Sequence, residues 1–222
     1  MALYALIMGL VVLLGVFLLA RALSDFMPGR KRLVKDLEQL KRDMDEWVDE
    51  LVPINNEELD AFSFNQRKQS VRKRFSKRAK GIFTTIYHEP VLAYSYRAYS
   101  GPRQKAILYA RTADRDFAYI KGKDGVRIAV GNRELGTLKE DGTLIGAQSR
   151  KAIAQISQAE GELLPVLVNE REVASVSRLE SGKQRDLGQR AFQFVREDMS
   201  PEEKDVFLSL AVLEVVHQSL SV

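Results

Sequence analysis

The feature that most constrains the fold is a strongly apolar segment close to the C-terminus. Residues 206–216 are apolar except for Ser209 and Glu214, so a helix formed here is apolar on nearly every side. An apolar run of 11 residues is too short to span a bilayer, and such a helix is stable only when protein surrounds it. Ser200, Pro201 and Glu203 supply the residues of a capped helix start. The sequence therefore predicts a buried helix over residues 200–219.

The region before this helix has the pattern of many short strands. Runs of Val, Ile, Tyr, Phe and Thr alternate with turns rich in Gly, Asn and Asp, as in antiparallel sheets. Eleven strands are predicted, over residues 82–87, 91–99, 106–111, 117–121, 126–130, 135–139, 143–147, 153–158, 164–168, 173–179 and 191–196. A sheet of this size buries an apolar helix most simply by curling around it. Residues 82–222 are thus predicted to form a mainly β, antiparallel barrel-like domain with a buried hydrophobic C-terminal helix.

One internal similarity appears within the predicted strands. Residues 130–138 resemble residues 168–176: each segment ends a strand in valine, turns through polar residues that finish in Arg-Glu, and restarts as a strand. The similarity predicts that one kind of hairpin is used twice. Chance similarity is the alternative, because two copies do not make a repeat array.

The N-terminus carries a second apolar segment. Residues 2–20 contain no charge, and as a helix they extend ~29 Å, about the thickness of one hydrocarbon core. The cations that follow are Arg21, Arg30, Lys31, Arg32 and Lys35. Positive flanks stay in the cytoplasm, and the absence of a basic residue before the segment disfavours a cleaved signal peptide. We expect an uncleaved single-pass anchor over residues 1–23, with the N-terminus outside and the C-terminal domain cytoplasmic.

A helical juxtamembrane region is predicted between the anchor and the barrel, over residues 24–81. Within 33–52, apolar residues recur at spacings of three and four, which indicates an amphipathic helix. They are Leu37, Leu40, Met44, Trp47 and Leu51. This stripe fits packing on the chain's own domain or a weak coiled-coil dimer.

The most biased segment is 65–81, which has eight cations and no acid. The cations are Arg67, Lys68, Arg72, Lys73, Arg74, Lys77, Arg78 and Lys80. Interpreted as a helix, the segment has a narrow apolar stripe flanked by charge, which is typical of helices that lie on anionic membranes. These residues are our candidate lipid-binding site. Pairing with the acidic helix before them, in a helical hairpin, explains the same charges, whereas nucleic-acid binding is disfavoured because no stacking motif accompanies them.

Composition and motifs restrict the chemistry. The chain has no cysteine, which excludes disulfides, thiolate zinc sites and thiol nucleophiles. His88 and His217 stand alone, and no common catalytic, phosphate-binding or calcium-binding motif occurs. We therefore predict no catalytic residue, cofactor or metal site, although a site assembled from distant residues leaves no local pattern.

The predicted barrel around a C-terminal helix resembles the tubby C-terminal and phospholipid scramblase-like superfamily. The residues that carry the resemblance are Ser200-Pro201-Glu202-Glu203-Lys204, the apolar run to Val216, and the hairpins with Leu135-Gly136 and Val173-Ala174. The resemblance covers about residues 82–222. It implies a twelve-stranded barrel that binds lipid or phosphoinositide close to a membrane, with a lipid-moving role in some members. The N-terminal anchor departs from the scramblase arrangement and puts transport in doubt.

These observations predict a non-enzymatic, membrane-anchored binding module that engages anionic lipid or a membrane-associated partner. The alternative is a structural or assembly protein that self-associates through its juxtamembrane helices, and an enzyme with a cryptic site comes third. The expected partners are the bilayer, anionic lipids, and a protein partner or a second copy of the chain. The lipid headgroup and the oligomeric state do not follow from the sequence.

Overall fold

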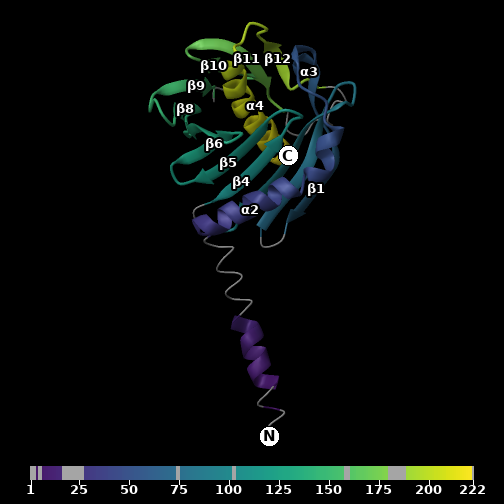
Figure 1. The fold of residues 1–222 in the computed structure, drawn as a ribbon, viewed down its shortest axis with the longest axis vertical. Coiled ribbons are helices and arrows are strands. Elements are labelled where there is room, and N and C mark those ends of the chain that lie inside the picture. The colour runs from purple at the N-terminus through teal and green to yellow at the C-terminus, as the bar shows by residue number, and fades with distance from the viewer. Residues whose placement is uncertain are drawn as a thin grey trace.

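A computed structural model describes residue 4 and residues 7–16, 28–73, 76–101, 104–157, 161–179 and 189–221. Among these residues, twelve antiparallel strands form one sheet whose strand order follows the sequence from β1 to β12. The sheet curls around helix α4 (Pro201–Ser221), which runs through its centre (Figure 1). The strands are β1 (Phe62–Lys73), β2 (Ser76–Thr85), β3 (Pro90–Tyr99), β4 (Ala106–Arg111), β5 (Asp116–Gly122), β6 (Gly125–Val130), β7 (Arg133–Leu138), β8 (Thr143–Gly146), β9 (Ala152–Ile156), β10 (Leu163–Val168), β11 (Arg171–Ser177) and β12 (Phe192–Val195).

A short seam joins the two ends of the sheet into a nearly closed barrel. The backbone N–H of Ala191 donates to the carbonyl of Phe62 at 2.8 Å, and that of Phe64 donates to Gln189 at 3.2 Å. Ser63 and Arg190 form an antiparallel bridge between these two bonds. The seam pairs the start of β1 with residues just before β12, so closure depends on segments from opposite ends of the domain.

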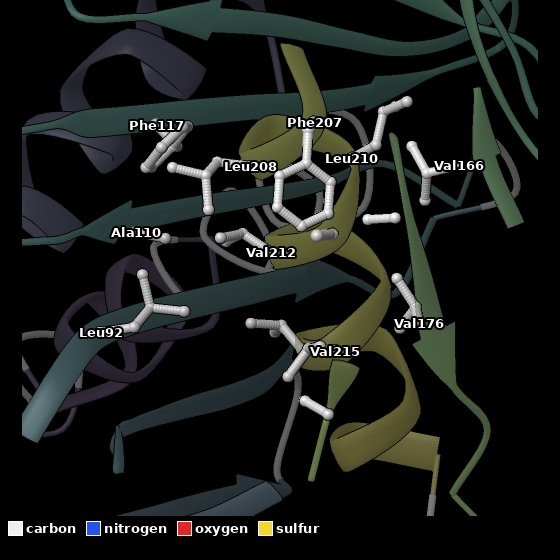
Figure 2. Packing of buried hydrophobic residues seen from close by; sticks show 14 of the residues in the cluster. Leu92, Ala110, Phe117, Val166, Val176, Phe207, Leu208, Leu210, Val212 and Val215 are labelled. Atoms are coloured by element: carbon white, nitrogen blue, oxygen red, sulfur yellow. The ribbon is translucent and has the colours of Figure 1, made fainter. Parts of the chain in front are cut away.

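Helix α4 is the centre of the hydrophobic core. Phe207, Leu210 and Val215 are at most 1% exposed and pack against inward-facing residues of several strands (Figure 2). Ser200 and Glu203 form the expected reciprocal cap: the Glu203 carboxylate accepts the Ser200 backbone N–H at 2.9 Å, and the Ser200 hydroxyl accepts that of Glu203 at 3.2 Å. The predicted buried C-terminal helix and the β barrel around it are confirmed.

Eleven of the strands, β2 to β12, correspond to the predicted ones. The internal similarity is also confirmed in the pairing register. In β6–β7, Val130 pairs with Arg133 and the next pairs leave Leu135 unpaired as a bulge. In β10–β11, Val168 pairs with Arg171 and Val173 is left unpaired in the same way. Both bulged residues are buried, so the two segments are one hairpin design used twice.

The predicted basic helix is wrong, because residues 62–73 and 76–85 form the hairpin β1–β2. Side chains in β2 alternate: Ala79 and Phe83 belong to the central core, while Ile82 packs with residues on the outside. Gly81 leaves room for the Tyr94 ring on the neighbouring strand, since a Cβ there would lie 3.1 Å from Tyr94 Cε1. The extended strands also place the cations farther apart than one helix would, which lowers the repulsion between them. The barrel wall therefore begins at Phe62 rather than at Ile82.

Helix α2 (Arg30–Arg42) lies on the outside of the barrel (Figure 1), and the short 3₁₀ helix η1 (Asp45–Glu50) contributes Trp47 to the same outer cluster. Leu40, Met44 and Trp47, at most 4% exposed, cover Ile82 and Ile107 on the outer face of the wall. The predicted amphipathic stripe thus packs on the chain's own domain. A third helix, α3 (Asn56–Ala61), starts with an Asn55–Glu58 capping box and leads into β1.

The predicted anchor, residues 1–23, lies mostly outside the described residues. Residues 7–16 are helical, and all their large apolar side chains are at least half exposed. No helix in the described part of the chain is both long enough and apolar enough to cross a membrane. The two hydrophobic clusters contain only residues from Leu33 onward. Both hydrophobic clusters of the described residues therefore lie within residues 28–221, and we expect residues 28–222 to fold without the preceding segment.

Candidate functional site

The hairpin β1–β2 and its neighbour β3 bring basic residues together on the outer wall of the barrel. Arg72 lies opposite Arg78, and Arg78 lies opposite Arg97 on β3. Residues directly opposite in an antiparallel pair have side chains on the same face, with Cβ atoms ~5 Å apart. Three arginines therefore form a row across three adjacent strands.

A second row lies beside the arginines on the same face, since residues two apart along a strand point the same way. Ser70 is opposite Lys80, and Lys80 is opposite Ser95. The two rows form one wall of a groove of about 250 Å³, which we call the basic groove. Its other wall is α2, through Asp36, Gln39, Leu40 and Asp43.

The charges in the groove are unevenly balanced. Arg97 Nη1 lies 2.9 Å from Asp36 Oδ1, so this buried arginine is neutralised by α2. Asp36 Oδ2 also accepts the Tyr99 hydroxyl at 2.6 Å. Burial raises the pKa of Tyr99, and its bond to Asp36 raises that pKa further, so the phenol stays protonated and holds the carboxylate in place.

Arg72 and Arg78 differ from Arg97. Both are exposed, and no carboxylate in the described part of the chain lies within ion-pair distance of either guanidinium. Like charges directly opposite each other destabilise a sheet. A bound anion removes this repulsion, and the planar guanidinium forks match phosphate and carboxylate oxygens. The groove is therefore suited to a small anionic group.

The basic residues nearer to η1 are partly used by the protein itself. Lys68 Nζ lies 2.7 Å from Glu50 Oε1, and Lys80 Nζ lies 3.9 Å from Glu46 Oε1. Both ammonium groups also lie over the Trp47 ring, at 5.8 Å and 4.7 Å from its centroid. The charge complementarity expected between the acidic and basic segments thus exists, between a helical segment and a sheet instead of between two helices.

Of the eight predicted lipid-binding residues, the structure brings Arg72, Arg78 and Lys80 into the basic groove. Arg67 and Lys68 are exposed on β1 outside it, and Lys77 lines the inner side of the barrel wall. The side chain of Lys73 and the whole of Arg74 lie outside the described residues.

Sequence reasoning missed Arg97, Ser70 and Ser95 as members of the groove. Arg97 is the only charged residue of strand 91–99, whose other residues except Ser95 are apolar or aromatic, and that isolation was the available signal. The two histidines lie apart, His88 in the turn after β2 and His217 exposed on the last turns of α4. The described residues contain no group of three or more His, Asp or Glu that could hold a metal ion.

Several other ion pairs have a structural explanation at the opposite end of the barrel. Arg115 on the β4–β5 turn lies 2.6 Å from Asp205 of α4, and Arg171 lies 3.2 Å from Glu203. These pairs fasten the first turns of α4 to the wall. Paired charges of this kind do not call for a ligand, which leaves the basic groove as the candidate site.

Comparison of the chain with protein-family models, curated proteins and solved structures found no match. The nearly closed twelve-stranded barrel agrees with the architecture that the family resemblance implied.

Proposed function

We propose that this protein is a membrane-attached, non-enzymatic module that binds the headgroup of an anionic lipid in the basic groove. The row formed by Arg72, Arg78 and Arg97 carries the proposal, because two of its three guanidinium groups lack a described carboxylate partner. The hydroxyls of Ser70 and Ser95 add hydrogen-bond donors for phosphate oxygens.

The position of the groove supports a membrane ligand. We call the barrel end that carries the β1–β2, β3–β4 and β5–β6 turns the proximal end. Lys105 Nζ, after the β3–β4 turn, donates to the carbonyl of Pro28 at 2.8 Å, so the chain from the N-terminal region joins the domain there. Arg72 and Arg78 lie next to the β1–β2 turn at this same end. The proposed anchor, residues 1–23, would hold the groove close to the cytoplasmic face of the bilayer.

The energetics favour such an arrangement. A basic residue near an anionic surface contributes ~1 kcal/mol, and the tether keeps the local lipid concentration high. Weak contacts with each headgroup are therefore sufficient to keep the groove occupied. The twelve-stranded barrel with its central helix also supports a proposed relationship to the tubby and scramblase-like superfamily.

Self-association through the juxtamembrane helix is the second candidate. It is less favoured because Leu40, Met44 and Trp47, which a helical dimer would use, are at most 4% exposed against the chain's own barrel. Light scattering of residues 28–222 tests this candidate: a stable dimer would favour it over lipid binding, and a monomer would count against it.

Vesicle flotation of residues 28–222 tests lipid binding. Binding should rise with the fraction of anionic lipid, fall with salt, and weaken at least about thirtyfold in Arg72→Glu/Arg78→Glu, since loss of the two cations alone removes ~2 kcal/mol and the new carboxylates are repelled. The matched control is Arg127→Glu/Lys151→Glu, which reverses two exposed cations outside the groove. Asp43→Asn should strengthen binding by removing the acid on the α2 side. Equal binding to neutral and anionic vesicles would contradict the proposal.

The topology has its own test in the full-length chain. Because the protein has no cysteine, Ala2→Cys and Lys123→Cys each introduce a single thiol. A membrane-impermeant thiol reagent added to intact cells should label the first variant, and should label the second only after permeabilisation. The reverse pattern would place the domain on the other side of the membrane.

A further inference from the structure

A second cavity lies inside the barrel, between α4 and the wall. Its volume is about 360 Å³, within the range of ~300–1,000 Å³ typical of small-ligand sites. Lys77, Lys121 and Val126 line it close to the proximal turns, and Leu220 lines it from the last turn of α4. The cavity is therefore at the proximal end, where the proposed anchor joins the domain.

The wall separates this inner cavity from the basic groove. Lys77, Ala106, Lys121 and Val126 belong to one row of opposed residues on the inner face. Arg78, Arg97 and Ile107 form the neighbouring row on the outer face. The two sites thus lie on opposite sides of the same strands.

Part of the apolar lining of the inner cavity is incompletely buried. Tyr96, Val126, Leu138, Leu213 and Leu220 pack against the main core but are only partly covered. By contrast, Phe207 and Ile128, deeper in the same core, are at most 1% exposed. An apolar ligand that entered the cavity would bury these exposed apolar surfaces, which favours binding.

The mouth of the cavity is basic. Lys77 Nζ donates to the Leu220 carbonyl at 2.5 Å, which caps the C-terminal end of α4. Lys121 is exposed, and its side-chain ammonium group makes no hydrogen bond or ion pair with any described residue. The charged and titratable groups contributed by α4 are Glu214 and His217, and Glu214 Oε1 accepts the Gln218 side-chain amide at 2.9 Å. Lys121 is therefore the cation placed to meet an anionic head.

We propose that the inner cavity binds one acyl chain of an anionic amphiphile, with its tail against Val126, Leu138 and Leu213 and its head at Lys121. The ligand class is a long-chain fatty acid or a single-chain lysophospholipid, which share an unbranched hydrocarbon tail and an anionic head. The bilayer expected beside the proximal end is its source, and to that extent the inference rests on the proposed function. Tyr96 lines both the cavity and the groove, but the proposed tail-binding residues and Lys121 line the cavity alone.

Calorimetric titration of residues 28–222 with octanoate, decanoate and dodecanoate, below their micelle concentrations, tests the tail. Affinity should rise about fourfold per methylene, as expected for burial of each CH₂, and should level off once the cavity is full. Decyltrimethylammonium should bind less tightly than decanoate because it meets Lys121. An affinity that is independent of chain length would overturn the proposal.

Three variants test the contributions of the tail-binding residues, Lys121 and the basic groove one at a time. Leu138→Trp should fill the cavity and weaken decanoate about tenfold or more, because a tail of several methylenes loses its place. Lys121→Gln should weaken decanoate but leave decanol unchanged, and Lys151→Gln is the matched control. Arg72→Glu/Arg78→Glu should leave decanoate affinity unchanged, so failure of the groove and failure of the cavity are distinguishable.

Folding is checked by the thermal unfolding midpoint of each variant. Leu138 is already partly exposed, so a larger side chain there is tolerated more easily than in the deep core. If Leu138→Trp does not fold, Lys121→Gln at the exposed mouth and the chain-length series still decide the question. A folded Leu138→Trp that binds decanoate normally would overturn the proposal.

The two ligand sources are separated in the full-length chain in membranes. Photoreactive fatty acid and photoreactive lysophosphatidate are added in parallel, and crosslinked peptides are mapped. Crosslinks of either probe to residues 126–138 or 213–221 support the site, and the stronger probe identifies the source. Crosslinks confined to other segments would overturn it.

Discussion

Helices α2 and α4 lie on opposite sides of the same part of the wall, yet they are held in different ways. Helix α4 is buried on almost every side by the barrel, whereas α2 buries only one face against the outside. Strands β3 and β4 between them are apolar on both faces, with Leu92 and Leu108 facing the central core and Ala93 and Ile107 facing α2. We therefore expect folding of the barrel to depend on the inner helix, and the outer helix to dock on a barrel that is stable without it.

The largest expected effect comes from placing a charge in the inner helix. Leu210 is 1% exposed, and Leu210→Asp buries a carboxylate without a partner. The cost should exceed ~4 kcal/mol, a large part of the stability of an ordinary domain. Urea unfolding followed by circular dichroism should find little folded protein. His217→Asp, on an exposed position of the same helix, should remain folded. A stable Leu210→Asp variant would show that the barrel does not depend on burial of α4.

A smaller effect is expected at the outer helix. Leu40 is 4% exposed against the wall, and Leu40→Asp should cost ~2–3 kcal/mol of α2 docking while the barrel persists. Trp47, on the adjoining helix η1, is the only tryptophan and belongs to the same outer cluster as Leu40, so its fluorescence reports loss of that cluster. In the variant, Trp47 emission should shift to longer wavelength before the far-ultraviolet signal of the sheet is lost in urea. Val34→Asp, on the exposed face, is the control. A single shared transition would show that both helices unfold as one unit.

Detachment of α2 should also open the basic groove. Asp36, Gln39 and Asp43 would leave together with the helix, so Arg97 would lose its carboxylate partner. We expect Leu40→Asp to bind anionic vesicles less selectively among headgroups, although not more weakly overall. Flotation with vesicles of different anionic lipids at equal charge measures this selectivity.

Capping of α4 gives a still smaller, pH-dependent effect. Ser200→Ala should cost ~1 kcal/mol through loss of the N-cap hydroxyl. The hydrogen bond from the Ser200 backbone N–H lowers the pKa of Glu203. The stabilisation that the Glu203 carboxylate contributes is therefore fully present above the unfolded-state pKa of Glu203. It is lost as pH falls through the lower folded-state pKa of the same group. Wild type should be more stable than Glu203→Gln near neutral pH, and the difference should disappear in acid. A difference that persists in acid would contradict this account.

The smallest effect is expected for the surface pair that links η1 to β1. Both partners are about two-fifths exposed, with side-chain exposures of 41% for Lys68 and 43% for Glu50. Exposed pairs contribute ~0–1 kcal/mol and are screened by salt. Glu50→Gln should leave the unfolding midpoint almost unchanged and slightly strengthen vesicle binding at low salt by releasing Lys68. Weaker binding in this variant would argue against a role for the charge.

An element of the fold was predictable from the sequence when the residues that indicate it are close together in the chain. The α4 cap and its all-round apolarity lie within consecutive residues, so position and burial of the helix were both predictable. Most strands were predictable for the same reason. Strand β1 and the first half of β2 were missed because their apolar residues, such as Phe64, Ala79 and Ile82, also fit a helical stripe, and the eight cations suited an amphipathic helix.

The basic groove required information that no single segment contains. Arg72, Arg78 and Arg97 become neighbours only through the registers of two strand pairs. The bulge between Arg67 and Ser70 changes the first of these registers, and no local pattern specifies it. The sequence therefore indicated that β1 and β2 are basic, but it did not indicate which cations share a face or that α2 supplies the acids.

The seam between Phe62 and Ala191 has a consequence for how the protein is made. The two edges that meet there lie near the beginning and the end of the domain, and the helix that fills the interior follows the second edge. During synthesis the strands can pair with their neighbours, but the sheet stays open, with its concave apolar side exposed, until β12 and α4 have left the ribosome. We therefore expect slow, largely post-translational folding that benefits from chaperones, and a strong sensitivity to truncation at the C-terminus.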